Sequence, residues 1–388
     1  MATTAFIGAR LILPDREVLD HALLVEGSTI TAIVPLSDVP TNADRLDLGG
    51  LVLAPGFIDV QVNGGGGVLF NDDPSADTID KIGRAHLPYG TTSFLPTLIS
   101  DTEEKMAAAL SAADDARTRS IGGAIGLHLE GPFLNADKRG IHDAAHFRAL
   151  SDETVATLAA FDAGHLMLTV APEQVSAATV RQLTEAGVLV SAGHTAATYE
   201  QTISTLNAGL RGFTHLYNAM PPMLSRAPGP VAAALESDAW CSIIADGHHV
   251  SDTMLKLAIR AKSDGRIMLI TDAMSSIGTN RELFKLGDKR IFVRDGHCVD
   301  ENGTLAGAHL TMIGAVENAV MCLGQSLVSA VRMASLEPAR FLKCEHLRGS
   351  LSPGRRADLV AWDDTFSVIV SAKADELSSF HENFSQPA

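Results

Sequence analysis

The sequence predicts an α/β protein, a (β/α)8 TIM-like barrel with a small β-sandwich domain formed by both chain termini. Eight short, nearly continuous apolar runs follow one another between residues 57 and 270. Stretches of helical pattern separate most of these runs, and strand-like segments lie at both ends of the chain. A doubly wound open sheet is the main alternative, but it usually has fewer strands, and no GxGxxG follows an early strand here.

The two ends of the chain have the pattern of strands joined by turns. A Gly-Ser pair separates two of the N-terminal runs, as expected of a hairpin. The expected strands are Ala5–Leu13, Ala22–Glu26, Thr29–Val34, Ala357–Trp362 and Phe366–Val370. We therefore expect residues 1–54 and 347–388 to form one small β domain, and residues 55–346 to form the barrel.

The eight central runs are expected to be parallel strands, because runs buried on both faces are apolar throughout. They are Phe57–Val62, Thr92–Leu98, Ala124–Leu129, Leu166–Val170, Leu189–Ala192, Gly212–Leu216, Cys241–Ala245 and Ile267–Ile270. The helical stretches include Thr102–Arg117, Ser151–Ala160, Ala177–Ala186, Thr198–Ala208 and Ser251–Ala261. Residues 281–304 interrupt the alternation with an Asp-Gly and an Asn-Gly turn, which predicts a hairpin-like insertion.

Composition and charge argue against several functional classes. The net charge of −16 makes a general affinity for nucleic acid or an anionic membrane unexpected. The four cysteines form no CxxC pair, so neither a disulfide framework nor a thiolate zinc site is expected, and a reducing cytoplasm fits. The N-terminus lacks the pattern of a signal peptide, and no apolar run reaches about 18 residues, so we expect no membrane span.

Polar side chains gather at the carboxyl ends of six of the eight runs. They are Asp59, Gln61 and Asn63; His128 and Glu130; Ser191 and His194; Thr214, His215 and Asn218; Asp246, His248 and His249; Thr271 and Asp272. Barrel closure brings these ends to one face, where the active sites of such barrels lie. The sequence therefore predicts a catalytic site at this face.

Three of these residues suit a divalent metal ion. Glu130, His194 and His215 offer one carboxylate and two imidazoles, a set that suits zinc and tolerates iron, cobalt or manganese. Either histidine alone could be a hydrogen-bonded structural residue. A carboxylate in an otherwise apolar run is harder to explain without a partner, because burying an unpaired charge is costly.

Asp272 at the end of the last run is free to act as a general base. In metal-dependent hydrolysis a base takes a proton from the attacking water and later returns it to the leaving group. Alone, this aspartate could be a helix cap or an ion-pair partner. A further polar group should orient the substrate carbonyl, and His142, His248 and His249 are the candidates.

The chain resembles the N-acetylglucosamine-6-phosphate deacetylase family of the amidohydrolase superfamily. The resemblance covers nearly the whole chain, and HLEGPF together with HLYNAMPP is its most specific part. The matching segments are APGFIDVQVNG (54–64), GLHLEGPF (126–133), RGIHD (139–143), SAGHT (191–195), THLYNAM (214–220), IIADGHHV (243–250), TDAM (271–274), GTLAGAHLTM (303–312), RMASLEPAR (332–340) and GSLSPGRRADLVAWD (349–363).

The resemblance implies hydrolysis of the acetamide of N-acetyl-D-glucosamine 6-phosphate to D-glucosamine 6-phosphate and acetate. By matching position, it makes Glu130, His194 and His215 metal ligands and Asp272 the general acid/base. It also implies a set of substrate contacts. They are His142, Asn218, Ala219, Arg226, His249, Leu305, Ala306 and Gly307.

The resemblance also bears on the substrate phosphate. Arg226 and His249 would hold the sugar phosphate, and the forked donors of an arginine suit that group. In the family some phosphate contacts come from the neighbouring subunit of a homodimer, so Arg226 could act across an interface. Without the resemblance, Arg226 in its Pro/Gly-rich loop could equally be a solvated residue.

The first run predicts one metal ion per subunit. Many amidohydrolases place HxH there and bind two ions, but this chain has Gln61 and Asn63. Neutral amides are poor zinc ligands compared with imidazole. Two alternatives remain open for the function. One is deacetylation of another phosphorylated amino sugar, such as N-acetylgalactosamine 6-phosphate, and the other is a non-catalytic barrel that serves as a binding protein.

Overall fold

The computed structural model describes residues 3–262 and 265–384. Contacts between residues divide the chain into two compact units. Unit 1 contains Met1–Asp59, His86–Ser93 and Thr311–Ala388, and unit 2 contains Val60–Ala85 and Phe94–Leu310. The predicted domain limits, 1–54 with 347–388 and 55–346, stay a prediction, because a compact unit does not show where an independently folding domain ends.

An eight-stranded parallel sheet forms the barrel and confirms the predicted fold class. Its strands are β8 (Phe57–Val62), β11 (Thr91–Ile99), β12 (Gly126–Glu130), β13 (His165–Val170), β14 (Leu189–Ala192), β15 (Gly212–Phe213), β16 (Trp240–Ile243) and β17 (Ile267–Leu269). They neighbour one another in chain order. The segment that follows β17 pairs with the end of β8 through a parallel bridge between Ala273 and Val62, so the sheet is nearly closed.

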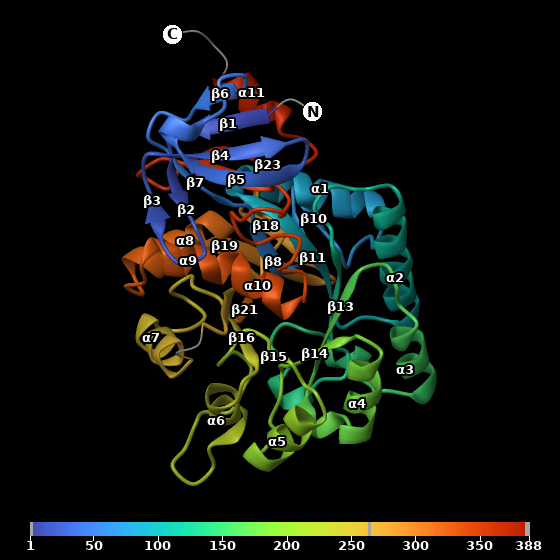
Figure 1. Ribbon diagram of the computed structural model, residues 1–388. Coiled ribbons are helices and arrows are strands. Elements are labelled where there is room, and N and C mark those ends of the chain that lie inside the picture. Colours follow the sequence, from blue (N-terminus) through green and yellow to red (C-terminus); the bar gives the residue numbers. More distant parts are fainter. Residues whose placement is uncertain (1–2, 263–264, 385–388) are drawn as a thin grey trace. The chain divides into compact units, whose positions relative to one another are not determined.

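Each barrel strand is followed in the chain by a helix. The helices are α1 (Ala76–His86), α2 (Glu103–Thr118), α3 (Asp152–Ala159), α4 (Ala177–Glu185), α5 (Tyr199–Asn207), α6 (Gly229–Glu236), α7 (Asp252–Ala261) and α8 (Met312–Met321). Each of α2, α3, α4 and α5 has a backbone N–H in its first turn that donates to the side chain of the residue before the helix, namely Thr102, Ser151, Ser176 and Thr198. Figure 1 shows these four helices in succession along the outside of unit 2.

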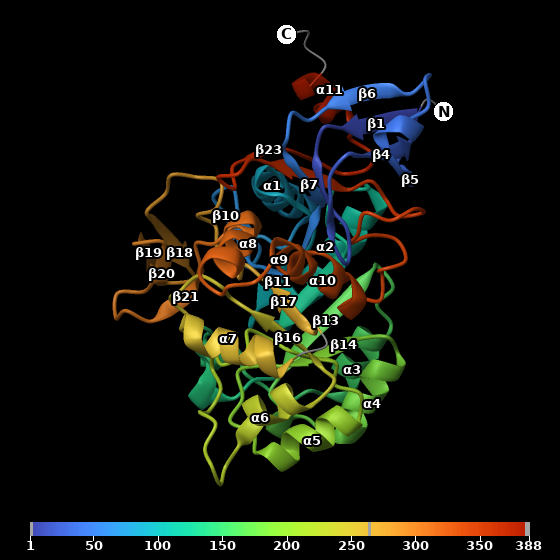
Figure 2. The ribbon, with the colours of Figure 1, turned by 60° about the vertical axis from the view of Figure 1, so that its left-hand side comes forward.

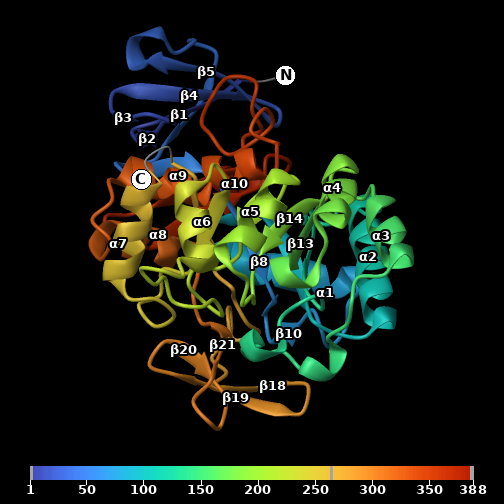
Figure 3. The same cartoon turned by 90° about the horizontal axis from the view of Figure 1, so that it is seen from below.

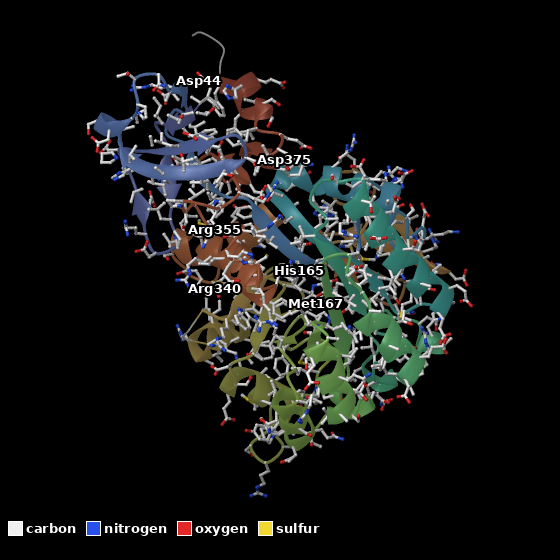
Figure 4. All side chains as sticks on the ribbon, turned by 45° about the vertical axis from the view of Figure 1, so that its right-hand side comes forward. Asp44, His165, Met167, Arg340, Arg355 and Asp375 are labelled. Atoms are coloured by element: carbon white, nitrogen blue, oxygen red, sulfur yellow. The ribbon has the colours of Figure 1, made fainter. Side chains whose placement is uncertain are left out.

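Side chains alternate between the two faces of each barrel strand. His128 on β12 and Thr169 on β13 contact each other through Nε2 and Oγ1 at 2.8 Å, and both are fully buried. His165 and Met167, both labelled in Figure 4, lie at alternate positions before Thr169 on β13, so the alternation puts all three on the same face. Glu130 lies two positions after His128 on β12, so its side chain points to the same, inward face of the strand.

The predicted insertion after β17 is a four-stranded antiparallel sheet. Its strands are β18 (Leu283–Leu286), β19 (Lys289–Arg294), β20 (His297–Val299) and β21 (Leu305–Ala308). Figures 2 and 3 show this sheet projecting from the barrel strands of unit 2. Phe284, Ile291 and Cys298 pack with Leu69 and Met274 in a small core beneath it. The insertion is therefore anchored beside the carboxyl ends of the barrel strands.

Unit 1 contains two sheets. One is built from N-terminal strands, and the other combines strands from both ends of the chain. One has the order β5-β4-β1-β6, and the other has the order β23-β22-β7-β2-β3. The strands are β1 (Thr3–Ile7), β2 (Arg10–Ile12), β3 (Glu17–Val18), β4 (His21–Glu26), β5 (Thr29–Pro35), β6 (Asp44–Asp47), β7 (Val52–Pro55), β22 (Leu359–Trp362) and β23 (Val368–Ala372). The two sheets share one core, with Phe6 and Leu23 from the first and Leu53 and Leu359 from the second.

The remaining helices of unit 1 are α9 (Leu327–Ala334), α10 (Leu336–Phe341) and α11 (Ser378–Phe384). Helix α11 lies beside β1 and β6 (Figure 1), and the rings of Phe380 and Phe6 form a T-shaped pair with centroids 5.3 Å apart. This contact joins the two ends of the chain, as expected of a β-sandwich that both termini build.

The expectation of a single strand over Ala5–Leu13 is wrong. The run divides into β1 and β2, which belong to different sheets. Gly8 lies between them with φ of 67°, and a Cβ there would meet Asp47 Oδ1 at 2.0 Å. A backbone in this left-handed region ends the extended run, which a pattern of apolar residues does not reveal. No helix in the described ranges is long and apolar enough to cross a membrane.

Candidate functional site

Three predicted ligand side chains converge at the carboxyl ends of three barrel strands. Glu130 ends β12, His194 follows β14 and His215 follows β15. Glu130 Oε1 lies 2.8 Å from His215 Nε2 and 3.2 Å from His194 Nε2, and the two nitrogens are 3.1 Å apart. All three side chains are buried. Two imidazole nitrogens and a carboxylate oxygen thus point at one spot.

The backbone at this site adopts conformations that side chains rarely tolerate. His194 has φ of 47°, His215 has φ of 34° and Asp272 has φ of 51°. Non-glycine residues in the left-handed region are strained, and such strain gathers at functional sites. The strands thus end in sharp turns, and these turns carry the functional side chains.

The electrostatics of the cluster suit a bound cation. Burial alone would raise the pKa of Glu130, but hydrogen bonds from His194 and His215 hold it well below its usual value. The carboxylate is therefore ionised. The three ligand atoms lie within 4.8 Å of one another, a spacing that one metal ion could bridge. One carboxylate with two imidazoles leaves room for water and substrate, as in catalytic zinc sites.

A backbone carbonyl holds the second nitrogen of His194. His194 Nδ1 lies 2.8 Å from the carbonyl oxygen of Lys138. A carbonyl only accepts hydrogen bonds, so Nδ1 carries a proton, and Nε2 is the His194 atom that could bind a metal ion in place of its hydrogen bond to Glu130. Such outer hydrogen bonds orient histidine ligands in metal sites.

Asp272 lies beside this cluster, held by the two amides of the first strand. Asn63 Nδ2 donates to Asp272 Oδ1 at 2.6 Å, and Gln61 Nε2 donates to the same oxygen at 3.2 Å. Burial first, and then the negative charge of Glu130, raise the pKa of Asp272 to about 6. A carboxyl with this pKa can both accept and return a proton near neutral pH.

His142 contributes a neutral imidazole. The backbone N–H of Ser100 donates to His142 Nδ1 at 3.4 Å, and Ser100 Oγ lies 2.9 Å from the same nitrogen. Burial, together with the charge of His194, lowers the pKa of His142 to about 3. Because Nδ1 accepts, Nε2 carries the proton, and it lies 3.9 Å from Glu130 Oε2. His142 is thus a neutral hydrogen-bond donor at the cluster.

His249 is paired with a buried carboxylate. Asp246 Oδ2 lies 2.6 Å from His249 Nδ1, and Asp246 Oδ1 accepts the backbone N–H groups of His248 and His249, both at 2.9 Å. These contacts outweigh burial and lower the pKa of Asp246. His248, in contrast, is exposed and lies against His297, with ring centroids 4.4 Å apart and the two planes tilted by 31°.

A cavity of about 330 Å³ connects these groups. Of the predicted residues, its lining includes Glu130, His142, His194, His215, Asn218, Ala219, His249, Asp272, Leu305 and Gly307. Ala306 is fully buried and Arg226 is exposed in the loop before α6, and neither is among the lining residues. Within the described ranges the lining contains two carboxylates but no lysine or arginine.

Pattern reasoning missed several residues of the site. Ile99, Ile141, Ile244 and Met274 form an apolar part of the cavity wall. Their side chains are apolar and unreactive, so no motif marks them as site residues. Only their positions, at strand ends or in the loop that carries His142, could have indicated that they line the cavity. Ser100, which directly follows β11 and contacts His142 Nδ1, was missed for the same reason.

Comparison with known proteins places the chain in a family. Residues 52–385 match the profile of the Amidohydrolase family. The chain is 41% identical over 335 residues to N-acetylgalactosamine-6-phosphate deacetylase of Shewanella sp. (strain ANA-3), covering 86% of this chain and 84% of the relative. It is 35% identical over 353 residues to N-acetylglucosamine-6-phosphate deacetylase of Haemophilus influenzae, covering 90% of this chain and 92% of that protein.

A solved structure agrees with these relatives. The crystal structure of N-acetylglucosamine-6-phosphate deacetylase from Pasteurella multocida superposes with a TM-score of 0.93 at 38% identity, over 96% of this chain and 98% of the other. The resemblance inferred from the motifs is therefore confirmed. The chain belongs to the amidohydrolase family, in the group formed by the N-acetylglucosamine-6-phosphate and N-acetylgalactosamine-6-phosphate deacetylases.

Proposed function

We propose that this protein hydrolyses the acetamide of N-acetyl-D-glucosamine 6-phosphate to D-glucosamine 6-phosphate and acetate. The convergence of Glu130, His194 and His215 beside Asp272 in one cavity carries the proposal. Relatives that act on phosphorylated N-acetyl amino sugars support the substrate class.

Glu130, His194 and His215 would hold one divalent ion, with zinc as the first candidate and iron, cobalt or manganese as alternatives. When bound, such an ion supplies Lewis acidity, which activates water for attack at neutral pH. Gln61 and Asn63 support a single ion, because their amide nitrogens donate to Asp272.

Asp272 acts as the general base and then as the general acid. Its ionised carboxylate accepts the proton of the attacking water, and the carboxyl then gives a proton to the amino-sugar nitrogen as the C–N bond breaks. Asn63 and Gln61 keep the carboxylate aimed into the cavity through Oδ1, which leaves Oδ2 for the proton.

His142 orients and stabilises the acetamide carbonyl. Its Nε2–H can donate to the carbonyl oxygen as negative charge develops there during attack. Because this imidazole stays neutral, it donates without adding charge to a site that would hold a cation. The apolar side chains of Ile99 and Ile141 beside it exclude water from the acetyl group.

The substrate phosphate requires cationic groups, and the cavity wall contains no lysine or arginine among its described residues. His249 is suited to this task, because it lines the cavity and Asp246 holds its ring in place through Nδ1. Arg226 on its exposed loop would complete the phosphate site, either in its own subunit or in the partner of a homodimer. We place the enzyme in the cytoplasm, consistent with its four free cysteines.

The galactosamine epimer is a second candidate substrate. The relative that is 41% identical to this chain is an N-acetylgalactosamine-6-phosphate deacetylase, which favours this alternative. The two sugars differ in the orientation of one hydroxyl. A comparison of kcat/KM for the two phosphosugars decides between them, and a higher value for the galactosamine epimer would overturn our assignment.

The decisive experiment is acetate release from N-acetylglucosamine 6-phosphate, with and without a chelator. We expect rapid release from the untreated protein, loss of release after chelation, and recovery on addition of zinc. A protein that releases no acetate from either phosphosugar in the presence of zinc would refute the proposed function.

A further inference from the structure

Glu173 lies outside the cavity but is bonded to the two loops that surround His194. It follows β13 in a short turn (Pro172–Gln174). Its Oε1 accepts the backbone N–H of Ala196 at 2.6 Å and the Asn135 amide at 2.9 Å, and its Oε2 accepts the Thr195 hydroxyl at 2.5 Å. One partly buried carboxylate therefore takes three hydrogen bonds.

The loop after β14 is the first of these two loops. Thr195 and Ala196 directly follow His194, whose backbone lies in the strained left-handed region. A strained residue keeps its conformation only when its surroundings hold it. Hydrogen bonds to a charged acceptor are the strong ones, and Glu173 supplies two of them to the residues immediately after His194.

The loop after β12 is the second. The backbone N–H of Asn135 donates to the carbonyl oxygen of His194 at 3.0 Å. Asn135 also caps the short helix Ala136–Lys138, and the Lys138 carbonyl accepts from His194 Nδ1. Glu173 fixes the Asn135 side chain, so it contacts both the residue that caps this turn and the residues that follow the histidine.

We propose that Glu173 is a positioning residue for the metal site, which clamps the two loops so that His194 presents Nε2 beside Glu130 and His215. This inference rests on the proposed function, because it requires His194 to be a metal ligand. Glu173 itself contacts neither the ligand atoms nor the cavity. Its effect passes through the backbone of residues 194–196 and the Lys138 carbonyl.

The test is the affinity of the metal-free protein for Zn²⁺, measured by competition with a chromogenic chelator. Glu173→Gln keeps the shape but removes the charge and one acceptor oxygen. Loss of an outer partner of a metal ligand typically weakens metal affinity about 10- to 100-fold, and we expect a loss of this size. With zinc at saturation, KM for the phosphosugar should stay near that of the wild type.

The matched control is Glu185→Gln, the same change at an exposed glutamate that ends α4. It should leave zinc affinity unchanged. Thr195→Val removes one of the three donors to Glu173, together with the acceptor of the Ala197 N–H, and should weaken zinc binding less than Glu173→Gln does. If thermal unfolding shows that Glu173→Gln does not fold without metal, Thr195→Val decides the test.

The outcomes separate this inference from the proposed function. His194→Ala should abolish tight zinc binding. If it does so while folded Glu173→Gln, or Thr195→Val in its place, binds zinc as tightly as the wild type, the clamp is refuted and the metal site stands. If His194→Ala also keeps full zinc affinity, the metal site itself is refuted.

Discussion

The amide of Asn63 should set the pH at which the protein becomes active. Asn63 Nδ2 donates to Asp272 Oδ1 at 2.6 Å in a buried setting, and this bond lowers the pKa of a carboxyl that burial raises. A hydrogen bond to a charged group contributes about 1.5–3 kcal/mol. At 1.36 kcal/mol per pKa unit, Asn63→Ala should therefore raise the pKa of Asp272 by about one to two units.

The sign of the effect follows from the role of Asp272. A general base works as the carboxylate, so activity falls as pH decreases through its pKa, which is about 6 in the native protein. With a pKa of about 7 to 8, the variant at pH 6 should have about 5- to 50-fold less ionised base. Above pH 9 most of the difference should disappear. A bound divalent ion lowers both pKa values, so the difference between the proteins is the quantity to measure.

The assay is kcat/KM for acetate release across the pH range, because this parameter reports the pKa of groups in the free enzyme. Asn207→Ala, which removes an exposed amide at the end of α5, is the control and should not move the profile. An acid limb that stays in place, or a loss of activity that is the same at every pH, would refute the reasoning.

Four further predictions concern the metal, the base and the phosphate. Metal analysis of the active protein should find one tightly bound ion per chain, and two would contradict the single site. Asp272→Asn should lower kcat about 10²- to 10⁴-fold while zinc stays bound, and substantial residual turnover would show that another group is the base. Asp246→Asn removes the charge beside His249, so it should raise KM for the phosphosugar far more than for the unphosphorylated sugar; equal effects would exclude a phosphate role. If Arg226 acts across a dimer interface, mixed dimers of Arg226→Ala and Asp272→Asn should regain activity that neither has alone, whereas no recovery would place Arg226 at its own site.

Much of the fold could be predicted because local patterns encode local elements. Continuous apolar runs predicted the barrel strands, and the helical stretches Thr102–Arg117 and Thr198–Ala208 predicted α2 and α5 to within one residue at each end. The ends of elements were harder to predict. Gly8 divides one apparent strand between two sheets, because a backbone dihedral and not hydrophobicity decides where the extended run stops.

The location of the candidate site could be predicted, because the barrel topology determines where the strands end. Parallel strands end at the same face of a barrel, so Glu130, His194 and His215 had to lie near one another once their runs were identified. The same reasoning placed Asp272 at that face, and the structure has all four side chains along one cavity. Their roles in binding and catalysis stay a prediction that the experiments above test.

The sequence by itself thus determined which barrel strands form, in what order, and which reactive side chains meet at their ends, since these depend on short-range patterns and on the geometry common to all such barrels. Only the tertiary structure decided which neighbours hold those side chains. Asn63 meets Asp272 across 209 residues, and Glu173 meets Thr195 across 22. Such hydrogen bonds depend on angstrom-scale distances between separate loops, and no local pattern encodes a distance between segments that closure of the barrel brings together.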